Sequence, residues 1–468
     1  MNRIREILAG LGRELVRVRW IVLLGLVIFA GRLHESDLRV DGLRYAAISR
    51  EMLTSGNLLV PHIGGELFLN KPPLLFWLTA LAMKVLGVGS FSAKIVSVLF
   101  GVGLMVLLFH LARRLFGKDS LGYLAALVFA TSFTVHYNTK DCRMESMMAF
   151  FLLAALYAFV LYLEQRQRRW LLLWGFSSGL AVLTKGVPGV LPLAVAFLYL
   201  ALFERRALDR RMLADMGLAL LVFAATFGWW YAYVMRATPF GDAFFRGQVF
   251  DRLSVGPVAP VGGAAGYAFG ETYRVYPVYS FLVALVQEYF YYLPFCVYGL
   301  VLLWREYRRD RMVRVLAIYL LIVLVGIHFI ATKYARYLYP AFPAFTIATA
   351  YGLARLVQVN WERVLIAVAI VVAAFVALYP GSLHGDYYSR LQEVNAMARQ
   401  ADLPIMVSDA FYRDMGRWAA PFYFDRYVRR RPASGPYLLV CNPDEAERSR
   451  LLFKTLRVAV YLRERNPD

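Results

Sequence analysis

The sequence has few cysteines and few histidines, and those present are scattered. Cys142, Cys296 and Cys441 are the only cysteines, and their separations fit neither a metal motif nor a redox motif. The six histidines show no HExxH-like spacing. The cysteines therefore imply no disulfide framework, and metal catalysis is not expected.

Acidic residues are also scarce, with 32 Asp and Glu against 52 Lys and Arg, which gives a formal net charge of +20. In a soluble protein such an excess would suggest a nucleic-acid partner. Here, however, 60% of the residues are hydrophobic and the mean hydropathy is +0.52, whereas an ordinary soluble domain is about half apolar. We therefore expect the lipid bilayer as solvent and no nucleic-acid partner.

Apolar runs recur along the chain, many of them near the ~20 residues that cross a bilayer as a helix. We count eleven, at 20–33, 91–111, 121–135, 147–163, 171–183, 187–203, 213–234, 278–304, 313–331, 337–357 and 364–379. The predicted fold class is an all-α polytopic membrane protein with about 11–13 transmembrane helices.

Arginine-rich connections indicate the orientation. Several arginines precede the first apolar run, and no small-residue cleavage site follows it, so we expect a retained anchor with a cytoplasmic N-terminus. Later clusters fall at every second connection, as the positive-inside rule requires. Counting the apolar stretch 73–87 as a span would place all these clusters outside, so we expect it to lie along the outer interface. The C-terminus is then periplasmic, at a bacterial inner membrane.

The predicted transmembrane domain covers 1–379. Its first outer loop, 34–90, should hold interfacial helices, with one helix over 41–55 that Gly56 ends. A later outer loop, 236–277, is rich in Gly and Pro. It is either a mobile loop that covers a substrate or a flexible linker.

The tail, 380–468, is predicted to form a small soluble periplasmic α/β domain. We expect a helix over 389–400, strands over 404–408 and 437–441, and a second helix over 443–456. This domain would hang over the outer face, where it is a candidate for acceptor recognition.

The outer loops carry a connected set of motifs. The first loop reads Asp41-Gly-Leu-Arg44-Tyr45, then Val60-Pro-His, then Phe68-Leu-Asn-Lys71-Pro-Pro; later come Arg143-Met-Glu-Ser-Met-Met, Thr184-Lys185-Gly186 and the aromatic run Tyr334–Pro343. Together they resemble the lipid A aminoarabinose transferase and protein O-mannosyltransferase families, which are membrane enzymes of the C-type glycosyltransferase (GT-C) fold. The resemblance covers roughly residues 15–355.

The resemblance implies transfer of a sugar from a polyprenyl-phosphate donor to an extracytoplasmic acceptor, which is a lipid, a glycan or a protein. In these families the first-loop Asp is the catalytic base or binds the acceptor, which maps to Asp41. The Arg and Lys of that loop grip the lipid phosphate, which maps to Arg44 and Lys71. The chain lacks a second carboxylate in Asp41-Gly42 and in Asn70-Lys71, where the families have Asp-Glu and Glu-Lys. We therefore expect no metal or other cofactor.

The residues support this chemistry without the families. A sugar on polyprenyl phosphate departs from the lipid phosphate, whose charge basic side chains can stabilise without a metal. Candidate phosphate ligands on the outer side are Arg44, Lys71, Lys333 and Arg336, with Tyr334 and Tyr337 as weaker candidates.

An attacking acceptor also needs a carboxylate to take or orient its proton. Asp41 is the first candidate, and Glu145 and Asp141 of the second outer loop are the others. A single direct displacement at the anomeric carbon predicts inversion of its configuration.

Structural explanations compete with these roles. Asp41 could instead be the N-cap of its helix. Arg44 could anchor its helix at the membrane interface, and Lys71 could belong to a solvated turn. Lys185 is as suited to reaching the interface as to binding a ligand, and Tyr334 would suit an interface belt.

For the whole protein, the rivals are a membrane transporter or lipid flippase and a non-catalytic scaffold. A transporter should show related halves with broken helices near the membrane centre, and no internal repeat is visible. We expect a monomer whose partners are the donor, the acceptor and membrane lipids.

Overall fold

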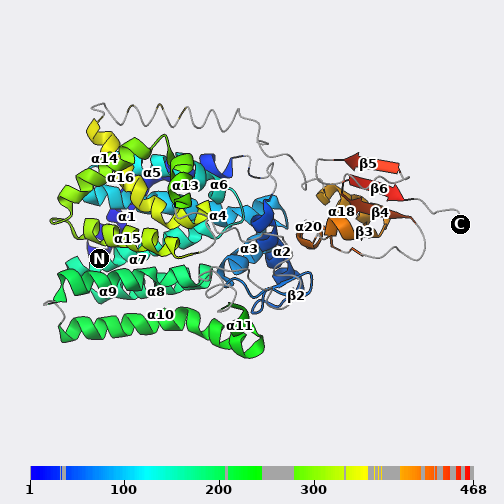
Figure 1. The fold of residues 1–468 in the computed structure, drawn as a ribbon, viewed down its shortest axis with the longest axis horizontal. Helices are drawn as coiled ribbons and strands as arrows, with labels where there is room; N and C mark the ends of the chain where they lie inside the picture. Colours follow the sequence, from blue (N-terminus) through cyan, green and yellow to red (C-terminus); the bar gives the residue numbers. More distant parts are fainter. Residues whose placement is uncertain are drawn as a thin grey trace.

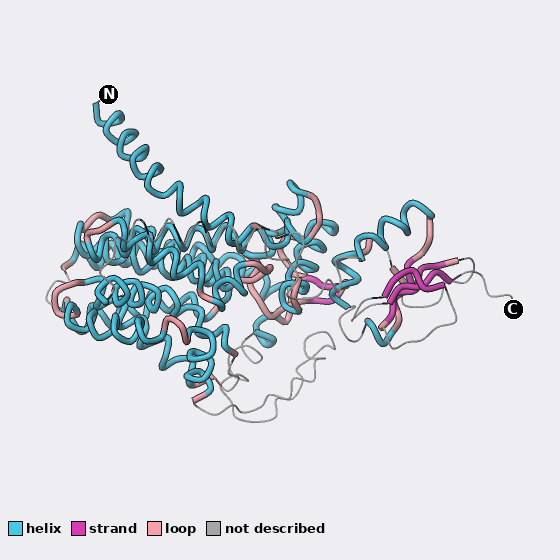
Figure 2. The backbone as a smooth tube through the Cα atoms, turned by 90° about the horizontal axis from the view of Figure 1, so that it is seen from above, coloured by secondary structure: helices cyan, strands magenta, loops and turns pink. Residues whose placement is uncertain are grey.

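The computed structural model describes residues 2–31, 33, 38–205, 209–244, 279–330, 334–356, 363, 367, 370, 391–412, 417–425, 427–428, 436–442, 450–454 and 459–463. The molecule is elongated (Figure 1). Long helices fill one end, α2 (Val40–Ser55) and α3 (Leu74–Leu86) lie in the middle, and a small sheet occupies the other end. Figure 2, a view at 90° to the first, also shows most of the helices towards one end and the larger sheet at the other.

The helical end contains most of the described chain. Its remaining helices are α1 (Asn2–Ala30), α4 (Ser90–Phe116), α5 (Asp119–Thr131), α6 (Phe133–Thr139), α7 (Glu145–Gln165), α8 (Arg168–Lys185), η2 (Val187–Val190), α9 (Leu191–Phe203), α10 (Arg210–Ala237), α11 (Phe240–Phe244), α13 (Ser280–Tyr289), α14 (Leu293–Glu306), α15 (Arg311–His328), η5 (Ala335–Ala341) and α16 (Phe342–Leu356).

Four described helices, α4, α7, α10 and α15, are long and apolar enough to cross a bilayer. The bent pair α5 and α6 also passes this criterion as one unit. The chain is a multi-pass α-helical membrane protein. The other predicted spans correspond to shorter or more highly charged helices, and 364–379 lies outside the described residues except for two isolated positions. The number of spans therefore stays a prediction.

Two predicted spans are broken in the structure. The run 121–135 is divided between α5 and α6, which meet at an angle of 70° at Ser132. The hydroxyl of Ser132 donates to the carbonyl of Val128, a bond that competes with continued helix geometry. The run 278–304 is divided between α13 and α14, and Pro294 stands in the first turn of α14, where proline starts a helix but cannot lie within one.

Small residues let the helices of this domain approach closely. A β-carbon at Gly175 of α8 would lie 2.2 Å from the carbonyl oxygen of Ala219 in α10. At Gly299 of α14 it would lie 1.8 Å from the carbonyl oxygen of Ala348 in α16. Such glycines permit backbone-to-backbone packing, which holds helices together where lipid removes the hydrophobic driving force.

The first outer loop forms helices as predicted. Helix α2 ends at Gly56, which has the left-handed φ of 72°, a conformation that glycine adopts at little cost. Asp41 lies in the first turn of α2 and not at its N-cap, which is Arg39, so the N-cap interpretation is wrong. The two-stranded hairpin β1 (His62–Ile63) and β2 (Glu66–Leu67) leads to Lys71 and α3.

The helical structure before the Gly- and Pro-rich loop 236–277 continues further than predicted. Helix α10 continues to Ala237, and α11 follows at Phe240–Phe244. Phe240 and Phe244 are buried against Trp230 and Tyr231 of α10, so aromatic packing extends the helical structure past 236. Residues 245–277 of this loop lie outside the described residues, and its role stays a prediction.

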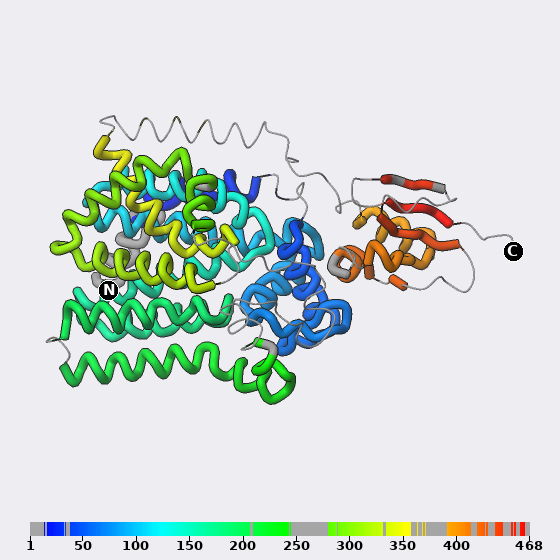
Figure 3. The backbone as a smooth tube through the Cα atoms, in the orientation of Figure 1, coloured from blue at the N-terminus to red at the C-terminus, as the bar shows by residue number. Residues whose placement is uncertain are grey.

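The tail forms the small α/β unit. Its elements are α18 (Leu391–Ala401), β3 (Ile405–Val407), α19 (Asp409–Phe411), α20 (Arg417–Tyr423), β4 (Tyr437–Cys441), β5 (Arg450–Lys454) and β6 (Ala459–Arg463). The strand order is β3-β4-β6-β5, with β3 parallel to β4 and the other pairs antiparallel. Figure 3 shows this sheet at the end of the molecule that holds the C-terminus.

One tail prediction is wrong. The predicted helix 443–456 contains strand β5, which pairs with β6, while 443–449 lies outside the described residues. The charged and apolar residues of this segment favour a helix locally, but pairing with β6 overrides that preference. Some buried residues of the sheet, such as Val407, Val440 and Val460, share one apolar core with those of α2. Others, such as Leu439 and Cys441, lie in a separate apolar cluster.

Candidate active site

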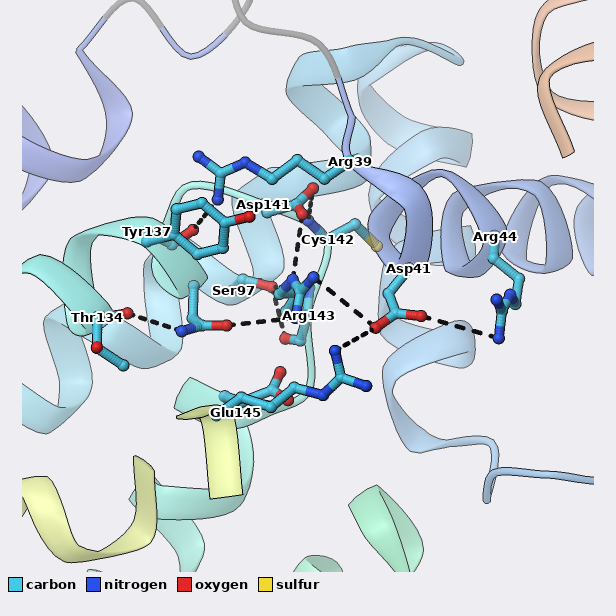
Figure 4. Close-up of polar contacts among 12 residues, drawn as sticks. Arg39, Asp41, Arg44, Ser97, Thr134, Tyr137, Asp141, Cys142, Arg143 and Glu145 are labelled. Atoms are coloured by element: carbon cyan, nitrogen blue, oxygen red, sulfur yellow. Dashed lines mark hydrogen bonds and ion pairs between the residues drawn. The ribbon is translucent and has the colours of Figure 1, made fainter. Parts of the chain in front are cut away.

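Asp41 stands at the centre of a charged cluster where α2 meets the helical domain. Its carboxylate is 3.0 Å from Nη1 of Arg336 on η5. It also lies 3.8 Å from Nη1 of Arg44, one turn along α2, and 3.8 Å from Nη2 of Arg143. In Figure 4, Arg143 and Arg44 lie on opposite sides of Asp41. Side chains from three separate parts of the chain thus share one carboxylate.

Burial alone would raise the pKa of Asp41, because its side chain is only 16% exposed. The positive charges of Arg336, Arg44, Arg143 and Lys71 outweigh this effect and lower the pKa to about 2. Asp41 is therefore ionised at any physiological pH. In return, the Asp41 and Glu145 carboxylates raise the pKa of Arg336 against the opposing effect of burial.

Asp141 is fully enclosed by protein groups. One carboxylate oxygen accepts from the backbone N–H of Cys142 at 2.9 Å, and the other accepts from Nε of Arg143 at 3.2 Å. A β-carbon at Gly42 would lie 2.0 Å from Oδ1 of Asp141, so the carboxylate fits only because residue 42 has no side chain. Asp141 orients Arg143 toward Asp41 and is only 1% exposed, a poor position for contact with substrate.

Glu145 begins α7 and is buried. Its Oε1 accepts a hydrogen bond from Nζ of Lys185, at the end of α8, with a distance of 3.0 Å. A buried carboxylate needs such a partner, since an isolated buried charge is very costly. The pair therefore fixes the ends of α7 and α8 beside Asp41 and Arg336.

A cavity of about 320 Å³ lies next to this cluster. Three cations line it, Lys71, Lys185 and Arg336, and two of them contact the carboxylates of Glu145 and Asp41. Most of the remaining lining is aliphatic: Val187, Val190, Ile322, Val323, Ile327 and Ile330. A cavity with cations and an aliphatic wall suits a ligand with an anionic head and a hydrocarbon tail.

The other residues selected from the sequence have different positions. Tyr337 lines the cavity, and Tyr334 packs its ring against the Arg336 guanidinium, whose Cζ is 4.3 Å from the ring centre. Both tyrosines are therefore near the cationic group. Lys333 lies outside the described residues, so its role stays a prediction.

Three further residues belong to the cluster although the sequence did not single them out as ligands. Arg143 joins Asp141 to Asp41, and Lys185 joins Glu145 to the cavity. Arg39 donates to the carbonyl of Tyr137 at 2.7 Å, and its guanidinium lies over the Tyr137 ring. Arg143 and Lys185 belong to two of the sequence motifs quoted above, and this membership could have identified them as site residues. Arg39 belongs to none of these motifs.

Cations outnumber carboxylates in this cluster. Asp41, Asp141 and Glu145 are surrounded by six cationic side chains, namely Arg39, Arg44, Lys71, Arg143, Lys185 and Arg336. The excess of positive charge favours an anionic ligand. Within the described part of the chain, no three His, Cys, Asp or Glu side chains are grouped so as to hold a metal ion.

The fold is similar to those of known proteins. A crystal structure of ArnT from Cupriavidus metallidurans bound to undecaprenyl phosphate is similar over 96% of this chain and 98% of that one, with a TM-score of 0.69 and 19% identity. The apo oligosaccharyltransferase of Archaeoglobus fulgidus is similar over 88% of this chain and 64% of that one, with a TM-score of 0.53 and 15% identity.

The chain has the GT-C glycosyltransferase fold. The GT-C fold expected from the motifs is thereby confirmed. In sequence, residues 70–230 match the family described as dolichyl-phosphate-mannose-protein mannosyltransferase. The undecaprenyl phosphate-α-4-amino-4-deoxy-L-arabinose arabinosyl transferase 1 of Proteus mirabilis is 31% identical over 44% of this chain, and an uncharacterised protein of Aquifex aeolicus is 34% identical over 44%. These matches span 38% and 41% of the two relatives.

Proposed function

We propose that the protein is a membrane glycosyltransferase that transfers a sugar from a polyprenyl-phosphate donor to an extracytoplasmic acceptor. The observation that carries this proposal is the cavity beside Asp41. It combines three cations, Lys71, Lys185 and Arg336, with an aliphatic wall. These are the two features that a polyprenyl phosphate requires, and the similar structure from C. metallidurans holds undecaprenyl phosphate.

The cations stabilise the leaving group. As the bond between the anomeric carbon and the phosphate oxygen breaks, its electron pair stays on the phosphate, which gains negative charge. Lys185 and Arg336 are already held in place by Glu145 and Asp41, so they need little reorganisation to bind that charge. A metal ion has no necessary part in this step, and independence of metals forms part of the proposal.

Asp41 is the proposed base. An acceptor oxygen attacks the anomeric carbon from the face opposite the phosphate, and its proton passes to Asp41. With a pKa of about 2, Asp41 is a weak base before the donor binds. A bound phosphate shares Arg336 with Asp41, which weakens the hold of the arginine on the carboxylate and raises its basicity. The single displacement inverts the anomeric configuration.

The arrangement of charge supports the proposed orientation. Helix α8 runs from Arg168 to Lys185, so one of its ends lies at the active site and the other does not. At that other end, Arg168 pairs with Asp215 of α10, and Arg311 of α15 pairs with Glu204. The positive-inside rule places this arginine-rich end in the cytoplasm. The active site and the C-terminal unit are then periplasmic, at a bacterial inner membrane.

A transfer assay tests the proposal. Purified full-length protein in lipid nanodiscs is given radiolabelled undecaprenyl-phosphate sugars, including 4-amino-4-deoxy-L-arabinose and mannose, with lipid A, glycan and protein acceptors. We expect label to pass to one acceptor, with inversion seen by NMR of the product. Lys71→Ala should reduce transfer strongly, whereas Lys84→Ala, an exposed cation on α3, should not.

A second assay, in proteoliposomes, separates the proposal from its rival. In proteoliposomes, a transporter or lipid flippase would move the lipid-linked sugar across the bilayer and leave its phosphate bond intact. Movement without cleavage for every donor and acceptor tested would overturn the transferase proposal. Equal transfer by wild type, Asp41→Asn and Lys71→Ala would instead overturn the assignment of the site.

A further inference from the structure

Arg50 joins helix α2 to the C-terminal unit. Its side chain is only 9% exposed. Nη1 donates to the backbone carbonyls of Pro421, Phe422 and Phe424, at 3.0, 2.6 and 2.9 Å. Nη2 donates to Oδ1 of Asp425 at 2.7 Å. One guanidinium thus binds four acceptors on a segment more than 370 residues away in the sequence.

Two of these acceptors lie in the last turn of a short helix, and the other two follow it directly. Helix α20 has only seven residues and contains Pro421, so few of its carbonyls can find a partner within the helix. Arg50 supplies the missing donors and places a positive charge at the negative end of the helix dipole. The conformation of the α20 terminus therefore depends on a residue of the transmembrane domain.

The contact extends into the C-terminal unit. The second oxygen of Asp425 accepts from Asn395 of α18 at 2.9 Å, and Arg399 of α18 pairs with the same carboxylate. The backbone N–H of Asp425 donates to the side chain of Asn395 at 3.1 Å. Arg50 is therefore connected directly to α20 and, through the Asp425 carboxylate, to α18.

The neighbour of Arg50 fixes the hairpin that leads to Lys71. The carboxylate of Glu51 accepts from the backbone N–H groups of Gly64 and Gly65, at 2.6 and 3.0 Å. The hairpin also lies against the C-terminal unit, since a β-carbon at Gly64 would be 3.4 Å from the hydroxyl of Tyr412. Helix α2, the hairpin and α20 thus form one connected assembly.

This assembly carries site residues at its other end. Asp41 and Arg44 lie in the first turns of α2, and Lys71 follows the hairpin. Buried residues of α2, such as Ala46 and Ala47, share one apolar core with Ala419 and Ala420 of α20. Because helices are stiff over this length and the core is closely packed, a shift at Arg50 reaches Asp41.

We propose that Arg50 is a positioning residue for the transfer reaction: by binding the end of α20, it makes the C-terminal unit a support that holds Asp41 and Arg44 in place opposite Arg336. The expected effect of Arg50 on sugar transfer rests on the proposed function. The expected effect of the contact with α20 on the conformation of α2 does not depend on that function.

The experiment compares three variants of the full-length protein. Arg50→Gln removes the charge and most of the donors, while Arg50→Lys keeps the charge. Arg399→Gln is the matched control, because it removes another arginine from Asp425, one that is 70% exposed and makes no described hydrogen bond to α20. Hydrogen–deuterium exchange and steady-state transfer kinetics are measured for each, and protection of β4 and β6 reports that the sheet is folded.

For Arg50→Gln we expect faster exchange both in α20 and in the first turns of α2. We also expect kcat to fall about 10- to 100-fold with the donor KM unchanged, since misplacement of a reacting group acts on the chemical step. Arg50→Lys should recover part of kcat, and Arg399→Gln should behave as wild type.

Two results would overturn the inference: faster exchange confined to the C-terminal unit with kcat unchanged, or a rise in donor KM alone. A wild type that transfers no sugar but shows the coupled exchange would refute the proposed function and leave the structural coupling in place.

Discussion

Arg336 and Asp41 form an ion pair, with Nη1 of the arginine 3.0 Å from Oδ2 of the aspartate. The pair joins η5, which lies between α15 and α16, to the first turn of α2. Arg336 also lines the cavity, so it contacts the proposed base and faces the proposed donor. In the proposed mechanism, this double position couples binding of the lipid phosphate to the basicity of Asp41.

Removal of the Arg336 charge should affect both functions. Arg336→Gln takes away the cation nearest to Asp41 and one of the three that line the cavity. We expect transfer to fall by about 100-fold or more, the cost of losing one fixed donor to developing charge. Undecaprenyl phosphate binding, followed by native mass spectrometry, should weaken in parallel. Arg169→Gln, an exposed arginine at the start of α8, is the control; equal losses in both variants would contradict this role.

The lowered pKa of Asp41 predicts a defined pH dependence of stability. Its pKa is about 2 in the folded protein, against 3.8 for an ordinary Asp. A depressed pKa means that ionised Asp41 stabilises the fold, by about 2 kcal/mol at neutral pH. This contribution is complete above about pH 4 and is lost as the pH falls toward 2.

The measurement is the difference in unfolding free energy between wild type and Asp41→Asn across this range. The difference should stay constant from pH 7 to about 4 and then shrink, because protonated Asp41 resembles asparagine. A difference that already changes between pH 5 and 7 would show that Asp41 is not held ionised by its arginines.

The contact between Gly42 and Asp141 can be tested by adding one methyl group. In Gly42→Ala the new β-carbon would lie 2.0 Å from Oδ1 of Asp141, so the carboxylate must move and Arg143 loses its support. We expect a destabilisation of about 1–3 kcal/mol, typical of an overpacked site, with reduced transfer.

Gly228→Ala in α10 is the control, since open space surrounds that position. The double variant Gly42→Ala with Asp141→Ala should be less destabilised than the sum of the single changes, because the clash is gone. Full additivity would show that Asp141 does not occupy the space beside Gly42.

Metal removal should leave transfer unchanged. Asp41, Asp141 and Glu145 are each paired with an arginine or lysine, so none of them needs a metal ion to balance its charge. Transfer rates before and after treatment with EDTA test this. A loss that Mg²⁺ or Mn²⁺ restores would contradict the proposed charge stabilisation by side chains alone.

The sequence predicted those elements whose signals are local. Helix α2 and its end at Gly56, helix α18 and strands β3 and β4 follow from apolar spacing and from glycine. Strand β5 was missed because its stability comes from pairing with β6, which lies outside the segment. The division of two apolar runs was also missed, since a serine or proline within such a run does not by itself break a helix.

The site could be predicted only in part. Asp41, Lys71 and Arg336 stand out as polar residues beside apolar segments, but their proximity depends on packing across the whole domain. Asp141 was considered as a catalytic group; the structure shows a buried carboxylate against Gly42, a relation that no local pattern encodes. The partners of Arg50 are backbone carbonyls at the end of the distant α20, which no local pattern encodes either.

A cryo-electron microscopy structure with undecaprenyl phosphate would show whether the cavity beside Asp41 binds the donor lipid. We expect the phosphate between Lys71, Lys185 and Arg336, with the first prenyl units along the aliphatic wall formed by η2 and α15. Phosphate density at any other cationic surface, with this cavity empty at saturating ligand, would contradict it.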